Sequence, residues 1–431
     1  MNDINHDLLA FLSASPTAFH ACENLASRLR GEGYRELNEF EAWPLCAGGK
    51  YFLRRNGSAL IAFRIPEGER RGFSMMAAHA DSPSFKLKEH ASAASAGMYT
   101  RLSVEKYGGM ICSSWLDRPL SVAGRVAVRE GEKVVMRLVN LDRDLLLIPN
   151  VAIHMDRSAN DGKKFDVNVD MLPLFGDASA EGALEKLLAD ELGVKEENIL
   201  FPDLSLYPRT PGCVWGAKNE YISSPRLDDL QCVFGCTEGF LHSSEQGNIP
   251  VLCVFDNEEV GSSTKQGADS TLLEDTLSRI CEALGMDLRR AVAQSFLVSA
   301  DNAHAVHPNH PEYADRGDRP EMNKGVVVKF NASQKYTSDA FSAAVFAEIC
   351  ARAGVPTQRY TNRPDMPGGS TLGNISTAHV SVDSVDIGLA QLAMHSAYET
   401  AGSLDTEYLI RAARAFYSAE LTRSSDGMHI G

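Results

Sequence analysis

The apolar and polar residues of the N-terminal part follow two different periods. Residues 18–30 carry apolar side chains at helical spacing and are followed by Gly31, which favours a helix that ends there. Residues 51–64 form two apolar runs around Asn56 and Gly57, a pair that tolerates the positive φ angles of a tight hairpin turn. The N-terminal part is therefore predicted to mix α and β structure.

A second pattern begins at about residue 87. Residues 125–129 and 133–139 alternate between β-branched and polar side chains, and few long helical stretches occur before residue 181. Alternation with a period of two indicates half-exposed antiparallel strands. We expect a β-rich segment here.

From about residue 227 the pattern changes again. Apolar runs at residues 249–255 and 326–330 are each followed by an amphipathic stretch, at residues 270–284 and 339–353. Such alternation of strands and helices is typical of an α/β sheet covered by helices.

One of these apolar strands ends at a cluster of acids. Residues 251–255 are followed by Asp256, Glu258 and Glu259. Carboxylates crowded at the end of a buried strand repel one another, and a metal ion or a proton offsets that repulsion. Neighbouring acids point in different directions, so one can bind a metal while the other transfers a proton. An isolated Glu-Glu pair is more often solvated loop charge, so the hypothesis needs partners elsewhere.

Possible partners follow other apolar runs. His79 and Asp81 end a short apolar run, and a metal-bound histidine commonly donates its second ring N–H to an acid. Asp301 follows residues 296–300, and His395 lies beyond the apolar run that starts at residue 386. Each residue alone is weak evidence, because a hydrogen-bonded histidine at a strand end is common. Together they indicate a shared site.

A further acid precedes a helical pattern. Asp228 and Asp229 both lie near the predicted first turn, and the pattern does not decide between them. With one of them, the chain supplies two histidines and three carboxylates. That set is sufficient for a paired-zinc site with one bridging carboxylate.

The order of these residues predicts the domain organisation. His79 precedes the β-rich segment and the other candidate ligands follow it. One common site therefore requires residues 1–86 and 225–431 to form a single catalytic domain, with residues 87–224 inserted into it.

Composition excludes several other functions. A chain of 431 residues is long enough for two domains. A formal net charge of −15 argues against a nucleic-acid partner, since phosphate binding needs clustered Lys and Arg. The N-terminus carries acids and lacks a basic or long apolar stretch, so we expect neither export nor a membrane anchor. The nine cysteines include no Cys-x-x-Cys pair and are expected to be free thiols, as in the cytoplasm.

Five ordered motifs resemble the M18 metallo-aminopeptidases, whose eukaryotic members are called aspartyl aminopeptidases. The matching segments are His79-Ala-Asp81-Ser-Pro83, Arg226-Leu-Asp228, Asp256-Asn-Glu258-Glu259-Val-Gly261, Ser299-Ala-Asp301-Asn-Ala-His304-Ala-Val-His307-Pro308-Asn309 and Ala393-Met-His395-Ser396. With weaker similarity between the motifs, the resemblance covers nearly the whole chain.

This resemblance implies particular roles for the candidate residues. The implied ligands of two Zn²⁺ ions per subunit are His79, Asp228, Glu259, Asp301 and His395. Asp228 would bridge the ions, Glu258 would be the general base, and Asp81 would orient His79. Acid and histidine ligands also accept Mn²⁺ or Co²⁺, so one site is expected to tolerate them.

The resemblance also implies a pocket and an assembly. Lys329 lies in an apolar run, so either its amine reaches water from an edge strand or it receives an anion. By resemblance, Lys329, His304 and Tyr336 would line a pocket for an acidic N-terminal side chain. The inserted segment would mediate dimerisation within a tetrahedral homo-dodecamer. His154, alone a common structural histidine, would reach the neighbouring subunit's active site.

The expected fold is therefore an α/β catalytic domain, with a mixed sheet flanked by helices and a β-rich dimerisation domain inserted. The expected activity is hydrolysis of an N-terminal Asp or Glu from peptides with a free N-terminus. A zinc carboxypeptidase or deacylase, and a non-catalytic shell-forming scaffold, remain as alternatives. Blocking the substrate's amino group separates the first two, because only an aminopeptidase needs that group.

Overall fold

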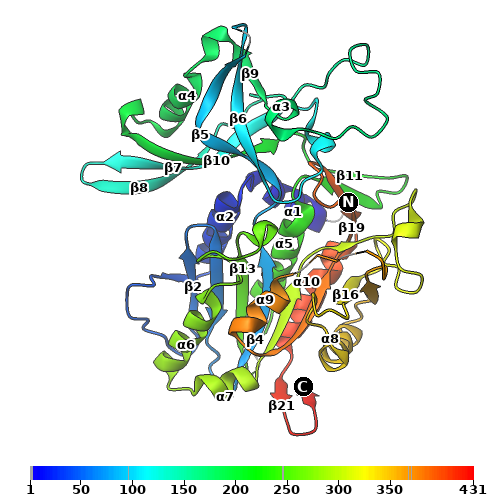
Figure 1. The fold of residues 1–431 in the computed structure, drawn as a ribbon. Coiled ribbons are helices and arrows are strands. Elements are labelled where there is room, and N and C mark those ends of the chain that lie inside the picture. Colours follow the sequence, from blue (N-terminus) through cyan, green and yellow to red (C-terminus); the bar gives the residue numbers. More distant parts are fainter. Residues whose placement is uncertain (1–2, 96, 245–246, 367, 370) are drawn as a thin grey trace.

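The larger of two main sheets forms the lower part of the molecule in Figure 1. The computed structural model describes all residues except 1–2, 96, 245–246, 367 and 370. In spatial order the nine strands are β1 (Arg35–Leu37), β2 (Lys50–Arg55), β3 (Ala59–Arg64), β13 (Ile249–Phe255), β4 (Phe73–His79), β14 (Phe296–Ala300), β18 (Asp383–Gly388), β16 (Val326–Phe330) and β17 (Thr357–Thr361).

The direction of the central strands brings their ends together. β4 runs parallel to β13 on one side and to β14 on the other, so the carboxyl ends of all three lie at one edge of the sheet. β3 is antiparallel to β13, and β16 is antiparallel to β18, which makes the sheet mixed. Side chains that directly follow β4, β13 and β14 therefore meet in space.

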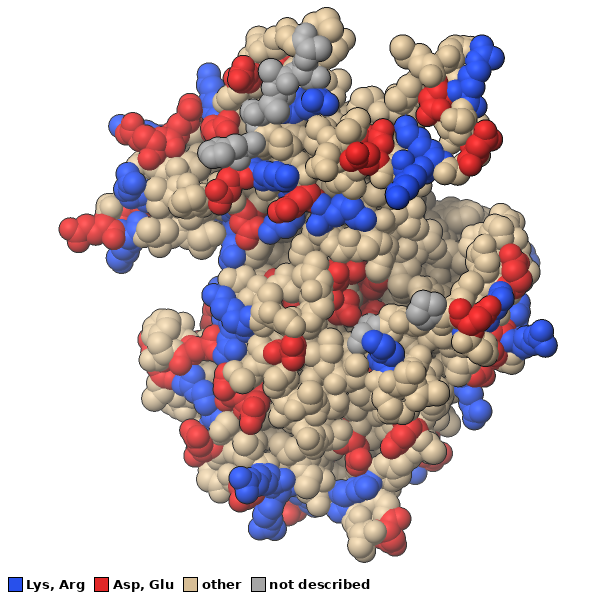
Figure 2. Space-filling view, viewed as in Figure 1, with Lys and Arg blue, Asp and Glu red and all other residues tan. Residues whose placement is uncertain are grey.

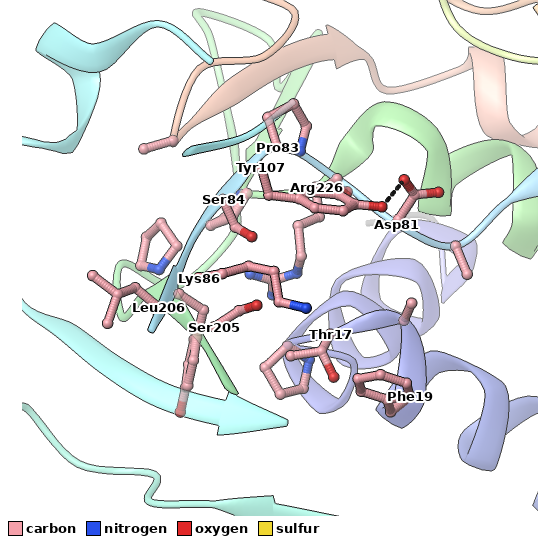
Figure 3. A pocket seen from close by; sticks show the side chains of 18 of the residues that line it. Thr17, Phe19, Asp81, Pro83, Ser84, Lys86, Tyr107, Ser205, Leu206 and Arg226 are labelled. Carbon is pink, nitrogen blue, oxygen red and sulfur yellow. Dashed lines mark hydrogen bonds between the residues drawn. The ribbon is translucent and has the colours of Figure 1, made fainter. Parts of the chain in front are cut away.

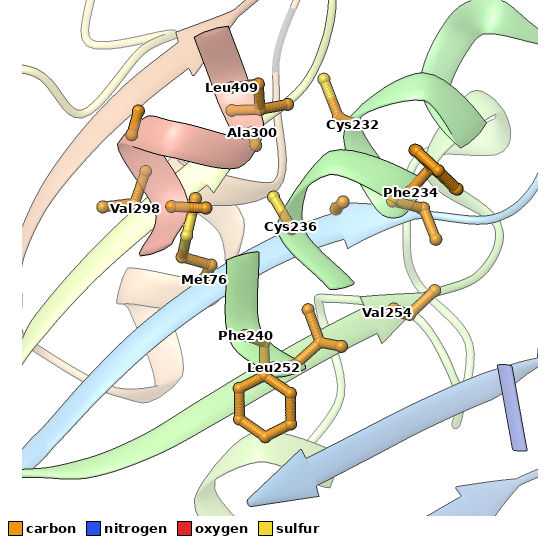
Figure 4. Close-up of a cluster of buried hydrophobic side chains, with 14 of the residues drawn as sticks. Met76, Cys232, Phe234, Cys236, Phe240, Leu252, Val254, Val298, Ala300 and Leu409 are labelled. Atoms are coloured by element: carbon orange, nitrogen blue, oxygen red, sulfur yellow. The ribbon is translucent and has the colours of Figure 1, made fainter. Parts of the chain in front are cut away.

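Helices cover both faces of this sheet because its strands are apolar on both sides. One face packs against α1 (Asp3–Ala14), α2 (Ala18–Gly31), α5 (Leu227–Leu241), α8 (Ala340–Arg352) and α10 (Asp405–Ser418). The other packs against α6 (Leu272–Leu284), α7 (Leu288–Ala293) and α9 (Leu372–His379). In Figure 4, Cys236 and Phe240 of α5 lie in the same buried cluster as Met76 and Leu252 of the sheet. All nine cysteines are free, as the sequence predicts.

The smaller main sheet lies above the larger one in Figure 1 and is antiparallel throughout. Its strands, in spatial order, are β8 (Lys133–Asn140), β7 (Leu120–Glu130), β10 (Ile199–Pro208), β5 (Ser84–Ser95), β6 (Tyr99–Tyr107) and β9 (Leu174–Asp177). Leu184 and Leu188 of α4 (Ala183–Leu192) pack into its core. The short helix α3 (Val167–Asp170) also lies in this segment.

A five-stranded sheet joins distant parts of the chain. Its strands are β11 (Cys213–Trp215), β12 (Tyr221–Ser224), β20 (Glu399–Gly402), β19 (Ala390–Leu392) and β15 (Ala303–His304). β11 and β12 lie within the predicted inserted segment, yet β12 pairs with β20 from the C-terminal part. The six-stranded sheet itself spans residues 84–208. The division into domains stays a prediction.

The remaining elements are short. They are the hairpin β21 (Leu421–Arg423) and β22 (Met428–Ile430), and the 3₁₀ turns η1 (Cys112–Trp115), η2 (Ala178–Ala180), η3 (Glu196–Asn198), η4 (Glu258–Val260) and η5 (Pro311–Tyr313). None of the described helices combines the length and apolar character needed to cross a membrane.

Local predictions and fold class agree with the structure. The hairpin turns at Asn56 and Gly57, whose φ angles are 59° and 70°. The helix predicted over residues 18–30 is α2, and the strands predicted at 249–255 and 326–330 are β13 and β16. The predicted α/β class, with a mixed sheet flanked by helices, is confirmed.

Candidate metal and active site

Acidic side chains gather in a hollow between the two main parts of the molecule (Figure 2). The hollow lies at the edge where β4, β13 and β14 end. His79 is the last residue of β4, Asp301 directly follows β14, and Glu258 and Glu259 form the η4 turn after β13. The sheet topology thus brings together residues more than 200 positions apart.

Two groups of ligand-type side chains share one carboxylate. His79, Asp228 and Asp301 form the first group, and Asp228, Glu259 and His395 the second, with the ligand atoms of each group within 4.8 Å of one another. Oδ1 of Asp228 lies 3.6 Å from Nε2 of His79, whereas Oδ2 lies 3.5 Å from Nε2 of His395. Asp228 therefore faces both groups, each with a different oxygen.

The geometry separates the two acids that the sequence leaves open. Asp228 and Asp229 lie at the start of α5, where their backbone angles are not helical, and the peptide bond between them is cis. Oδ2 of Asp229 accepts a hydrogen bond from the backbone N–H of His79 at 3.2 Å. Asp229 supports the strand that carries His79, and only Asp228 belongs to the two groups among the described residues.

Asp81 contacts three parts of the site. Its carboxylate lies 3.4 Å from Nδ1 of His79, which leaves Nε2 of that ring to face Asp228. Its two oxygens also accept hydrogen bonds from the backbone N–H groups of Glu258 and Glu259, both at 3.1 Å. Burial opposes ionisation, but His79, the Tyr107 hydroxyl and the backbone N–H of Glu259 hold the pKa of Asp81 below its usual value. Asp81 therefore acts as an ionised acceptor.

His395 is held in place through its backbone and its ring. Nδ1 of the ring lies 3.1 Å from the carbonyl oxygen of Gly109, so Nε2 faces Asp228 and Glu259. The backbone N–H of His395 donates to Glu399 at 2.7 Å, and the backbone N–H of Asp228 donates to the other oxygen of Glu399 at 3.0 Å. One buried carboxylate thus links the two segments that carry these side chains.

Burial makes the acids of the η4 turn hard to ionise without a cation. Burial and the nearby acids Asp301 and Asp81 raise the pKa of Glu258 to about 8, although His79 opposes this. Burial and Asp228 raise the pKa of Glu259 as well. These shifts follow from crowding carboxylates away from water.

A buried cation and aromatic rings lie beside the first group. Lys329 is 2% exposed, and its Nζ lies 3.5 Å from Oδ2 of Asp301 and 5.4 Å from the ring centre of Tyr336. β16 lies between β18 and β17, so an edge position for Lys329 is excluded. The Tyr360 ring lies 6.3 Å from that of Tyr336 and 6.0 Å from that of His304. The three predicted pocket residues are therefore connected through contacts.

His154 does not join the other predicted residues. It is exposed on a turn between β8 and α3, in the segment above the hollow. It belongs to neither group of ligand-type side chains found among the described residues.

Comparison with known proteins places the chain in a family. The profile described as "Aminopeptidase I zinc metalloprotease (M18)" matches residues 11–417. The chain belongs to the M18 family. A Clostridium acetobutylicum protein named "Probable M18 family aminopeptidase 2" is 45% identical over 423 residues, which cover 95% of this chain and 98% of that protein.

Solved structures of M18 proteins have the same fold. Ape4, in a cryo-EM structure with Nbr1, is similar at a TM-score of 0.93 with 36% identity, covering 96% of this chain and 85% of that chain. The Saccharomyces cerevisiae mApe1 dodecamer is similar at a TM-score of 0.85 with 25% identity, covering 96% of each chain. The predicted family and the metallo-aminopeptidase class are confirmed. Membership argues against the carboxypeptidase, deacylase and scaffold alternatives.

The donor set suits the zinc that the M18 family uses. Oδ1 of Asp228 and Oε1 of Glu259 are buried and have no hydrogen-bond partner among the described residues. Buried carboxylate oxygens without donors are costly unless a cation binds them. Histidine nitrogen and carboxylate oxygen are both ordinary zinc ligands. The residues present therefore fit divalent metal ions.

Three residues that contact the candidate ligands or the pocket are not predicted from the sequence. They are Glu399, which links Asp228 to His395; Tyr107, which donates to Asp81 at 2.7 Å; and Tyr360, beside Tyr336. Each lies outside the five motifs, and its contacts arise only from the tertiary fold. The acid at position 399, four residues after His395, was the one available signal.

Proposed function

We propose that this protein is a dizinc aminopeptidase that removes an N-terminal Asp or Glu from peptides. The observation that carries the proposal is the position of Asp228, whose two oxygens face a different histidine on either side. Such a carboxylate suits a bridge between two metal ions. The family is a zinc metalloprotease family, which supports zinc as the metal.

Each of the two groups of ligand-type side chains is assigned to one metal ion. His79, Asp228 and Asp301 would hold one ion, and Asp228, Glu259 and His395 the other. When bound, a pair of zinc ions lowers the pKa of a water molecule and polarises the carbonyl of the scissile peptide bond. Mn²⁺ or Co²⁺ would be tolerated at one of the positions, because both accept the same ligand types.

Glu258 is the proposed general base. Its backbone N–H is held by Asp81, and the adjacent Glu259 belongs to a ligand group, so the two carboxylates have separate tasks. A Glu258 oxygen takes the proton from the attacking water and then gives it to the nitrogen of the departing amine. Asp81 keeps His79 and the η4 turn in position during both transfers.

The preference for an acidic N-terminal residue is proposed from the charge of Lys329, which lies beside the first ligand group. Burial opposes the charge of Lys329, but Asp301 and Tyr336 raise its pKa above the usual value, so the ammonium persists. A carboxylate side chain of the substrate would pair with it, and Tyr336 and His304 would line the pocket. A neutral side chain would leave the ammonium without that partner.

We also propose that the chain forms a homo-oligomer, as the similar mApe1 dodecamer does. The edge strand β8 exposes Val134, Met136 and Leu138, at 66%, 49% and 40%. Residues two apart lie on one face of a strand, and an apolar edge strand is prone to pair with another chain. This supports dimerisation through the six-stranded sheet. In such an assembly the exposed His154 would be free to reach a neighbouring active site.

The cellular compartment is proposed from the free state of the cysteines. All nine cysteines are free, and six of them are fully or nearly fully buried core residues. Free thiols are typical of reducing compartments. We therefore propose a cytoplasmic location, which fractionation of the producing cells would test.

The central test compares matched peptides that begin with Asp, Glu or Leu. We expect the zinc-loaded protein to cleave the Asp and Glu peptides with the higher kcat/KM, and a chelated sample to cleave none of them. Acetylated versions should resist cleavage, because an aminopeptidase needs the free amine. Equal or better cleavage of the Leu peptide would contradict the acidic pocket and leave the metal chemistry intact. Full activity after chelation would contradict the zinc mechanism.

A further inference from the structure

A short segment of the six-stranded sheet runs across the candidate site. This segment, residues 107–111, consists of Tyr107, the last residue of β6, and the connection from β6 to η1. The Tyr107 hydroxyl donates a hydrogen bond to Oδ2 of Asp81 at 2.7 Å and accepts one from Nδ2 of Asn257 at 2.8 Å. Figure 3 shows the hydroxyl directed at Asp81, on the wall of a pocket that Lys86 and Arg226 also line.

The hydrogen bond from Tyr107 to Asp81 supports the η4 turn, which carries the proposed base Glu258. The two oxygens of Asp81 accept the backbone N–H groups of Glu258 and Glu259. Asn257, which precedes that turn, has a φ of 62° and donates its side-chain N–H to the Tyr107 hydroxyl. The hydroxyl thus fixes the turn from two sides, through Asp81 and through Asn257.

The same segment also contacts the second ligand group. The carbonyl of Gly109 faces the ring of His395, and the backbone N–H of Ile111 donates to the carbonyl of His395 at 3.0 Å. Gly108 has a φ of +75°, and a Cβ there would lie 3.1 Å from Cβ of Glu259. A glycine is required for such a close approach of the backbone. The segment therefore lies against both the base-bearing turn and His395.

We propose that Tyr107 is a positioning residue for hydrolysis, and that the six-stranded sheet thereby takes part in the active site through residues 107–111. The role rests on the proposed function, because it acts through Glu258 as the base. A hydroxyl that donates to an ionised carboxylate and accepts from an amide has one favourable orientation. It therefore holds Asp81, and with it the η4 turn, in a single arrangement.

The test removes only the hydroxyl. Tyr107→Phe is expected to lower kcat about tenfold or more, because a hydrogen bond to a charged group contributes at least that factor. KM is expected to stay within about twofold, and the zinc content to equal that of the unmodified protein, since Tyr107 belongs to neither ligand group. Tyr417→Phe is the matched control, because the hydroxyl of Tyr417 in α10 donates a buried hydrogen bond to the carbonyl of Val251 at 3.0 Å and does not line this pocket.

A double-mutant cycle separates positioning from general damage. Added to Glu258→Gln, Tyr107→Phe is expected to lower kcat by less than about twofold, because the group through which it acts is already absent. The same tenfold loss in both backgrounds would overturn the proposal, as would a loss that parallels zinc content or one shared by Tyr417→Phe. If Glu258→Gln alone keeps its activity, the base assignment fails, which is a separate result from the effect of Tyr107→Phe.

Discussion

Replacing Lys329 by Met tests the acidic pocket most directly. The change keeps the length of the side chain and removes a charge that lies 3.5 Å from Asp301 and is 2% exposed. Two opposite charges about 4 Å apart attract by about 4 kcal/mol at an effective dielectric constant of about 20. Desolvation of the substrate carboxylate offsets part of this, which leaves about 2 to 3 kcal/mol. The preference for Asp over Leu should therefore fall roughly 30- to 150-fold.

The assay compares kcat/KM for matched Asp and Leu peptides in zinc-loaded Lys329→Met. Lys324→Met, an exposed change just before the same strand β16, controls for net charge. Stability gives a second readout, because removing one partner of a buried ion pair costs about 3 to 5 kcal/mol. That cost is expected in the metal-free variant and should shrink when zinc neutralises Asp301. An unchanged Asp-to-Leu ratio in a folded, zinc-loaded variant would refute the pocket.

Three further predictions concern the metal groups. Glu258→Gln should keep both zinc ions and lose at least ~10²-fold in kcat, as measured by metal analysis and steady-state kinetics; near-full activity would show that another group is the base. Asp228→Asn should lose both ions in equilibrium dialysis, whereas Asp229→Asn should retain them, because among the described residues Asp228 alone belongs to both groups. Burial raises the pKa of Glu258 and of Glu399 to about 8 in the absence of metal, so folding favours their protonated forms. That contribution to stability is fully present below about pH 4.5, the usual pKa of a glutamate, and it is lost progressively as pH rises through the folded-state value of about 8. The Tm of the metal-free protein should therefore fall between about pH 4.5 and 8 and level off above that range, and zinc should reduce the part of the fall that comes from Glu258; a flat calorimetric profile would contradict these shifts.

The sequence predicts those parts of the site that depend on one strand and its end. His79, Glu258, Glu259 and Asp301 each follow an apolar run, and those runs are the central strands β4, β13 and β14. Period and length are local properties, so they are visible without the fold. The parallel pairing of the three strands is not a local property of the sequence. It follows from the prediction that their terminal residues share one site.

Other features depend on contacts that no local pattern contains. The choice between Asp228 and Asp229 rests on backbone angles at the start of α5, where neither residue is helical. Lys329 looks the same in sequence on an edge strand and on an inner one. Glu399 reaches the ligand segments only because β20 pairs with β12, at the register Ser224 to Glu399. Propensity carries no information about such pairings.

Charge balance connects metal binding, folding and selectivity in this site. In the metal-free protein the buried ammonium of Lys329 lies 3.5 Å from Asp301 and pairs with it. On the proposed assignment, zinc takes over the neutralisation of Asp301, and Lys329 is then left with an unmatched charge beside Tyr336. A buried charge without a partner is costly, and a carboxylate from the substrate removes that cost. Preference for an acidic N-terminus should therefore depend on occupancy of the first metal group, so the same metal that permits hydrolysis also creates the specificity.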